Sequence, residues 1–168
     1  MQNIILGNFL SLLAMCSDSF SSSRKTTKGV LMTQNLSQFF YGLSSLVLGG
    51  YSAVVQNVVS ILRNFVAMSK ISSKVVEWTL IGLGVGLGVY FNNLGLVGWL
   101  PILANFEYSI AVFRFKDNER ALKASFLVCC LLFTIFNIFI YNAVGVISNT
   151  IVIISIIMFL WRGRKKEA

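Results

Sequence analysis

The sequence predicts an all-α membrane protein of seven transmembrane helices, arranged as two parallel three-helix repeats joined by a linking helix (3+1+3). Three observations support this fold class. First, 56% of the 168 residues are hydrophobic and only 12% are charged, far from a soluble composition. Second, long apolar blocks alternate with short basic segments. Third, one layout of basic cluster, apolar block, uncharged turn and apolar block begins at Arg24 and recurs 92 positions later, at Lys116.

The apolar blocks give the expected helices in chain order. Residues 1–168 form a single membrane domain, in which 1–69 are the first repeat, 75–92 the linking helix and 95–162 the second repeat. The first helix is the weakest because Asp18 lies near its end, and whether it fully spans is left open. The seven expected helices cover 4–20, 29–48, 51–69, 75–92, 95–114, 122–141 and 143–161.

The distribution of basic residues predicts the orientation. All 14 Lys and Arg fall in the 1–2, 3–4 and 5–6 connections, at the adjoining helix ends or in the C-terminal tail. The other three turns, Gly49-Gly50, Asn92-Asn93 and Tyr141-Asn142, carry no Lys or Arg. The positive-inside rule therefore places the N-terminus outside and the C-terminus in the cytoplasm. Interfacial aromatics are expected near helix ends at Trp78, Trp99 and Trp161.

Composition also excludes several classes of function. The net charge of +8 is read as the positive-inside bias, so we expect the lipid bilayer and no nucleic acid as a partner. The chain has no histidine, and we expect no enzyme activity, no cofactor and no metal site. The three cysteines lie within apolar segments and are interpreted as small packing residues: Cys16, Cys129 and Cys130.

A run of alternating glycines marks the linking helix. Gly82, Gly84, Gly86 and Gly88 provide overlapping small-xxx-small spacings, Gly82 with Gly86 and Gly84 with Gly88. No strand precedes this run, so it is not a dinucleotide-binding loop. In lipid, such spacings permit close helix packing, and they offer a contact for a homo-oligomer.

Polar residues inside the apolar blocks are the candidate site. Asn57 and Asn149 occupy matching positions of the two repeats and could bind a polar substrate or serve as hydrogen-bonding contacts between helices. Gln34, Gln38 and Tyr41 share one face of the second helix, which must point inward and not toward lipid. These five residues are the predicted substrate-binding positions.

A single ionisable side chain lies well inside the fifth predicted helix. Glu107 is therefore a candidate for coupling or gating, with a purely structural carboxylate as the alternative. Arg63, Arg114 and Lys123 are interpreted as interfacial anchors and not as ligands.

Specific segments of the chain resemble a known family. They are Gln34-Asn35, Phe39-Phe40-Tyr41-Gly42, Leu48-Gly49-Gly50-Tyr51-Ser52-Ala53, Asn57, Leu62-Arg63-Asn64 and Trp99-Leu100-Pro101-Ile102-Leu103. Over nearly its full length the sequence resembles the YgjV family of small bacterial inner-membrane proteins, which implies a multi-pass protein of that membrane. The layout is distantly similar to SWEET sugar transporters and PnuC vitamin-precursor transporters.

The SWEET-like layout implies roles for particular residues. In SWEET-like proteins an asparagine of the third helix and one of the seventh line the substrate pocket, which implies this role for Asn57 and Asn149. Those proteins also carry prolines in paired helices of both halves, whereas Pro101 is the only proline of this chain. Pro101 is thus a second gating candidate, and its lack of a partner argues against a symmetric rocking motion.

Two functions from different classes remain open at this point. The first is a carrier or facilitator for a small polar solute, with a central site between the two three-helix halves. The alternative is a non-transporting membrane scaffold or accessory subunit, whose buried asparagines only hold the helices together. A hydrated central cavity favours the first, and a dry, tightly packed interior favours the second.

Overall fold

The computed structural model describes residues 1–22, 27–69, 73–115 and 118–164, and all regular structure within them is α-helical. Arg24, Lys25, Lys70 and Lys116, on which the expected charge layout depends, lie outside the described residues. The described segments form α1 (Gln2–Ser22), α2 (Thr27–Val47), α3 (Tyr51–Met68), α4 (Lys74–Tyr90), α5 (Trp99–Arg114), α6 (Glu119–Phe139) and α7 (Ala143–Arg164).

The largest difference from the expected boundaries is at the start of α5. This helix begins at Trp99, because the chain first makes a tight turn through Gly95, whose φ is +56°. The Asn92 side chain closes that turn: its Nδ2 donates to Gly95 O (2.8 Å) and its Oδ1 accepts from Leu94 N (3.1 Å). At the start of α6, Asn118 Oδ1 accepts from Ala121 N (3.0 Å), an N-cap that begins the helix before the predicted residue 122.

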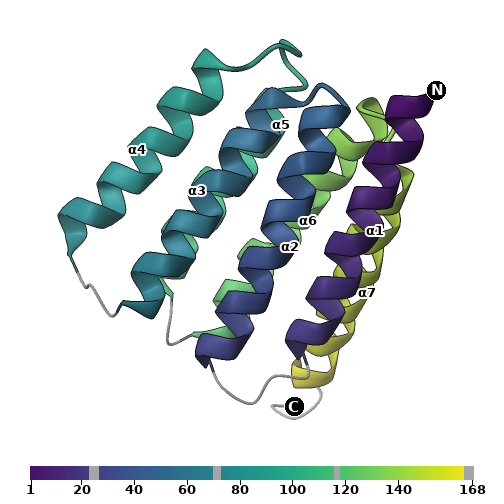
Figure 1. The fold of residues 1–168 in the computed structure, drawn as a ribbon. Helices are drawn as coiled ribbons and strands as arrows, with labels where there is room; N and C mark the ends of the chain where they lie inside the picture. The colour runs from purple at the N-terminus through teal and green to yellow at the C-terminus, as the bar shows by residue number, and fades with distance from the viewer. Residues whose placement is uncertain (23–26, 70–72, 116–117, 165–168) are drawn as a thin grey trace.

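The helices are arranged in two layers, with α1 to α4 in one row and α5 to α7 behind it (Figure 1). Six helices close into a ring in the order α1, α2, α3, α5, α6, α7, because α3 contacts α5 and α7 contacts α1. The remaining helix, α4, packs only on α3 and α5 and lies outside this ring. The start of α1 and the end of α7 lie at opposite ends of the molecule (Figure 1).

The turns α2–α3 and α6–α7 have the same hydrogen bonds at positions 92 apart. Gly50 N donates to Ser45 O (2.8 Å), and Asn142 N donates to Asn137 O (2.9 Å). The residue before each donor has a positive φ, +78° at Gly49 and +58° at Tyr141. Both α2 and α6 therefore end in a Schellman motif with a left-handed residue just after the helix. The predicted turns at Gly49-Gly50 and Tyr141-Asn142 are both observed.

Each of these turns is held by an asparagine from elsewhere in the chain. Asn93 Nδ2 donates to Gly49 O (2.6 Å), and Asn93 Oδ1 accepts from Tyr51 N (3.3 Å). At the second turn, Asn8 Nδ2 donates to Tyr141 O (3.0 Å), and Asn8 Oδ1 accepts from Val144 N (3.0 Å). Asn93, in the connection between α4 and α5, thus stabilises the α2–α3 turn, and Asn8 of α1 stabilises the α6–α7 turn.

Polar and apolar residues are distributed as expected for a protein surrounded by lipid. Eighteen polar or charged residues are buried among the described residues, against thirteen hydrophobic ones, and large apolar side chains cover the outside. Within the described segments, three helices are long and apolar enough to cross a membrane: Gln2–Phe20, Arg120–Phe139 and Ala143–Trp161. Helices α4 and α5 are the shortest, with 17 and 16 residues, against the about 20 residues of a typical transmembrane helix.

The glycines of α4 divide between two faces. Gly84 and Gly88 are buried against the ring, where a Cβ on Gly88 would lie 2.5 Å from Gln56 Nε2 and 2.9 Å from Ile102 Cγ1. Gly82 and Gly86 are exposed, and a Cβ on either would meet no atom within 4 Å. The Gly84/Gly88 spacing therefore serves packing within the chain, and a homo-oligomer through the Gly82/Gly86 face stays a prediction.

We expect Gly88→Ala to destabilise the protein by about 1–3 kcal/mol, because the added methyl group overpacks the contact with Gln56 and Ile102. Gly86→Ala is the matched control on the same helix and is expected to have little effect. Thermal unfolding in detergent, followed by tryptophan fluorescence, measures both. Equal unfolding midpoints for the two variants would contradict this account of α4 packing.

Candidate functional site

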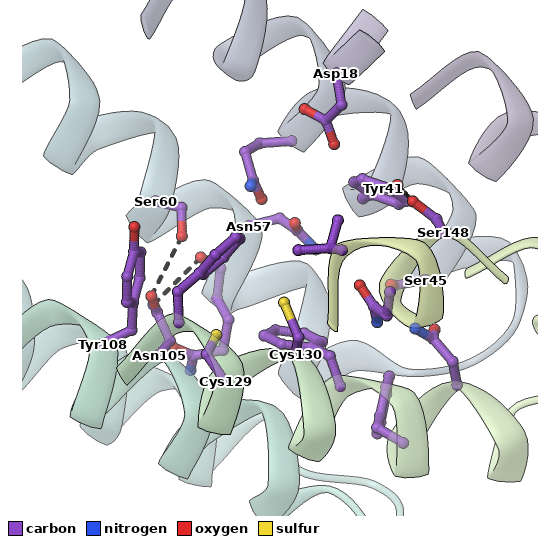
Figure 2. Close-up of a pocket in the computed structure, with 18 of the residues that line it drawn as sticks. Asp18, Tyr41, Ser45, Asn57, Ser60, Asn105, Tyr108, Cys129, Cys130 and Ser148 are labelled. Carbon is purple, nitrogen blue, oxygen red and sulfur yellow. Dashed lines mark hydrogen bonds between the residues drawn. The ribbon is translucent and has the colours of Figure 1, made fainter. Parts of the chain in front are cut away.

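A cavity of about 140 Å³ lies inside the six-helix ring. Figure 2 shows it as a polar chamber, with side chains from both layers of helices directed into it. Its volume is close to the roughly 150 Å³ that holds one benzene molecule in an engineered protein cavity. The chamber therefore has room for several water molecules or one small solute.

Most residues of the cavity wall carry hydrogen-bonding or charged groups. Six lining residues lack a strongly polar group: Phe126, Cys129, Cys130, Phe133, Phe136 and Val152. The polar and charged lining consists of Asp18, Gln38, Tyr41, Ser45, Gln56, Asn57, Ser60, Arg63, Asn105, Tyr108, Asn137, Asn142, Ser148 and Asn149. A wall of this composition can bind and orient a hydrophilic molecule.

The two halves of the chain contribute residues at corresponding positions. Six lining residues of the first half have counterparts 92 positions later that also line the cavity: Gln38/Cys130, Tyr41/Phe133, Ser45/Asn137, Gln56/Ser148, Asn57/Asn149 and Ser60/Val152. In three of these pairs a polar or hydroxyl-bearing residue of the first half corresponds to a cysteine, phenylalanine or valine at the matching position of the second. The two halves thus contribute cavity-lining residues at corresponding positions, but these residues differ in polarity.

Four of the five predicted substrate-binding residues line this cavity, namely Gln38, Tyr41, Asn57 and Asn149. The fifth, Gln34, is half-buried outside the lining, one turn below Gln38 on α2, and its backbone carbonyl accepts from Ser37 Oγ (2.9 Å).

The hydrogen bonds of these residues differ. Asn57 Nδ2 donates to Ala53 O of its own helix (2.8 Å), and within the part of the chain that the structure describes Asn57 has no hydrogen bond to another helix. Tyr41 OH and Ser148 Oγ, by contrast, lie 2.9 Å apart and connect α2 to α7. Tyr41 therefore joins the two halves, whereas Asn57 keeps its amide oxygen available toward the cavity.

The two gating candidates lie outside the lining. Pro101 is fully buried in the first turn of α5. Glu107, further along α5, is half-buried, and its Oε2 is buried without a hydrogen-bond partner. A gating role for either residue stays a prediction.

Asn105 on α5 is the centre of a buried hydrogen-bond network at the α3–α5 contact. Its Nδ2 donates to Gln56 Oε1 (2.8 Å), and its Oδ1 accepts from Ser60 Oγ (3.3 Å) and Arg63 Nη1 (3.2 Å) (Figure 2). Gln56 Nε2 continues the network to α4 by donating to Gly84 O (2.8 Å). One asparagine thus connects three helices.

The interpretation of Arg63 as an interfacial anchor is wrong. Its side chain is only 8% exposed and lines the cavity instead of reaching the membrane surface. It donates to Asn105 and, over 3.1 Å, to Ser109 Oγ, and its Cζ lies 5.2 Å from the centroid of the Tyr108 ring. Arg114 is exposed at the end of α5.

Sequence reasoning also missed Asp18 as a site residue. Its carboxylate lines the cavity and accepts from Ser37 Oγ, on the side of the cavity opposite Asn105 and Tyr108 (Figure 2). The sequence signal that could have identified Asp18 is its charge, which lies near the end of an apolar block. Of the cysteines, Cys129 and Cys130 are buried in the cavity wall, whereas Cys16, predicted as a packing residue, is exposed.

The arrangement defines the class of protein. Apolar side chains face outward, polar side chains face a central chamber, and the described helices include spans suited to a bilayer, so this is a helical membrane protein with a polar interior. No group of three or more His, Cys, Asp or Glu residues suited to a metal ion occurs within the described ranges.

The chain belongs to the Imp-YgjV family of bacterial inner membrane proteins, whose family model matches residues 5–167. It is therefore an inner-membrane protein, as the sequence resemblance predicted. A search of curated proteins and a search of solved structures find no protein that matches it.

We expect Asn105→Ala to lower the free energy of unfolding by about 2 kcal/mol, because four hydrogen bonds are lost at about 0.6 kcal/mol each. The matched control is Thr150→Ala, whose exposed hydroxyl bonds only to Val146 O of its own helix (2.7 Å). Unfolding in a denaturing detergent series measures both variants. A loss for Asn105→Ala no larger than for Thr150→Ala would show that the network does not hold α3 and α5 together.

Proposed function

We propose that this protein is a small carrier or facilitator that moves a small polar solute across the bacterial inner membrane. The observation that carries the proposal is the polar cavity inside the six-helix ring, to which both halves of the chain contribute matching positions. In lipid, each buried polar group needs a hydrogen-bond partner. Helix association alone is therefore served by direct contacts between polar groups and does not require a hydrophilic chamber at the centre of the protein. With no histidine in the chain, we propose transport and not catalysis.

We further propose the 3+1+3 arrangement, with seven spans and parallel halves. Helices α2 and α6 begin and end at positions 92 apart, and the turns after them share one hydrogen-bond pattern. Exchanging α1 with α5, α2 with α6 and α3 with α7 converts every neighbour pair of the ring into another neighbour pair. An axis along the membrane normal relates repeats in this way, and α4 then acts as the linking helix.

The proposed topology places the N-terminus outside and the C-terminus inside. In a Cys16→Ser background, we expect Leu96→Cys and Tyr141→Cys, on exposed turn residues, to react with a membrane-impermeant maleimide in intact spheroplasts. Lys74→Cys, exposed at the opposite end, should react only after permeabilisation. Labelling of Lys74→Cys in intact spheroplasts would reverse the orientation.

Transport is tested with the purified protein in liposomes exposed to a mixture of small polar metabolites, with the contents analysed by mass spectrometry. We expect Asn57→Ala and Asn149→Ala to lower the flux of the transported solute at least about tenfold. The unfolding midpoint should change little, because among the described residues neither asparagine has a hydrogen bond to another helix. Thr150→Ala, next to Asn149 and exposed, is the matched control.

Two results would count against the carrier. If the wild-type protein accumulates no solute above empty liposomes, the scaffold alternative gains support. If both asparagine variants keep full flux, the solute does not pass the cavity described here.

A further inference from the structure

Arg63 occupies an unusual position for a cation in a membrane helix. It is the thirteenth of the 18 residues of α3, about 18 Å along the helix from Tyr51 and about 8 Å from Met68, the last residue. The Arg63 side chain is 8% exposed and lines the cavity. A charged group buried within a membrane helix is costly, and it is by default a candidate functional residue.

The protein supplies only part of the hydrogen bonding that this guanidinium requires. Nη1 donates to Asn105 Oδ1 and Ser109 Oγ, and both acceptors are uncharged. Arginine carries five N–H donors, so Nη2 and Nε together retain three. Within the described residues these two nitrogens have no acceptor. Arg63 is thus held rigidly on one side and open on the other.

The charge of Arg63 is also uncompensated. No ion pair joins it to a carboxylate among the residues that the structure describes. The carboxylate that lines the cavity, Asp18, accepts from Ser37 and lies on the side away from Asn105 and Tyr108 (Figure 2). Removing a charge from water without a counter-ion is unfavourable, so an anion in the cavity would stabilise Arg63 in addition to the Tyr108 ring, whose centroid lies 5.2 Å from Cζ.

We propose that the solute of this cavity carries a carboxylate or phosphate group, which Arg63 binds through two parallel hydrogen bonds. This inference rests on the proposed carrier function and names its class of substrate. The free side of the guanidinium is a planar fork that matches the two oxygens of either group. The negative charge of Asp18 at the far wall repels an anion and orients the solute with its anionic group toward Arg63. The volume of about 140 Å³ limits the solute to a small molecule.

The test uses the full chain in nanodiscs of phosphatidylcholine, a lipid without net charge, at constant ionic strength. Thermal unfolding is followed while sodium lactate, sodium phosphate or glycerol is added. We expect lactate, phosphate or both to raise the unfolding midpoint in a saturable manner, and glycerol, a neutral molecule of similar size, to leave it unchanged. A response to lactate alone identifies a carboxylate site, and a response to phosphate alone a phosphate site.

Variants connect this response to Arg63. Arg63→Gln should abolish it, and Arg63→Lys, which keeps the charge but loses the fork, should raise the half-saturating concentration at least about tenfold. Arg114→Gln removes an exposed arginine and should respond as the wild type does. If Arg63→Gln does not fold, Arg63→Lys still decides the question.

Three results would overturn the proposal: no response to either anion, an equal response to glycerol, or an undiminished response in Arg63→Lys and Arg63→Gln. The liposome experiment separates this inference from the carrier function. Anion binding without flux would retain the site and reject the carrier, whereas flux of an uncharged solute would retain the carrier and reject the anionic substrate.

Discussion

Polar side chains in the interior of a membrane protein must satisfy one another, because neither lipid nor bulk water is available to them. Asn105 shows how this requirement organises the molecule. It bonds to Gln56, Ser60 and Arg63 of α3, and Gln56 in turn bonds to the backbone of α4 at Gly84. This single amide makes four hydrogen bonds across the contact between α3 and α5.

The opposite contact between the halves is built differently. At the α1–α7 side, Asn8 binds the backbone of the α6–α7 turn, and Asn93, in the α4–α5 connection, binds the α2–α3 turn in the same way. An asparagine from elsewhere in the chain thus stabilises each of the two turns. The two turns share their backbone hydrogen bonds, although Gly50 and Asn142, the second residue of each turn, differ chemically.

This division between framework and side chains has a consequence for function. Matching backbones produce a central chamber to which both halves contribute, but their side chains need not match. The first half provides Gln38, Tyr41 and Ser60, where the second half provides Cys130, Phe133 and Val152. A chamber with one strongly polar wall and one weakly polar wall can orient a solute that has a charged end and a less polar end.

The sequence by itself determined the helices, the turns, the 92-residue offset and a polar interior, because hydropathy, glycine placement and charge are local properties of the chain. It also identified four of the residues that line the cavity, since a polar residue in an apolar block must face inward. Only the tertiary structure decided that Gln34 stays outside the lining, that Arg63 is buried and not anchored at the interface, and that Asp18 reaches the cavity. Helical periodicity defines which residues share a face, but the packing of neighbouring helices decides which part of that face meets lipid, protein or cavity.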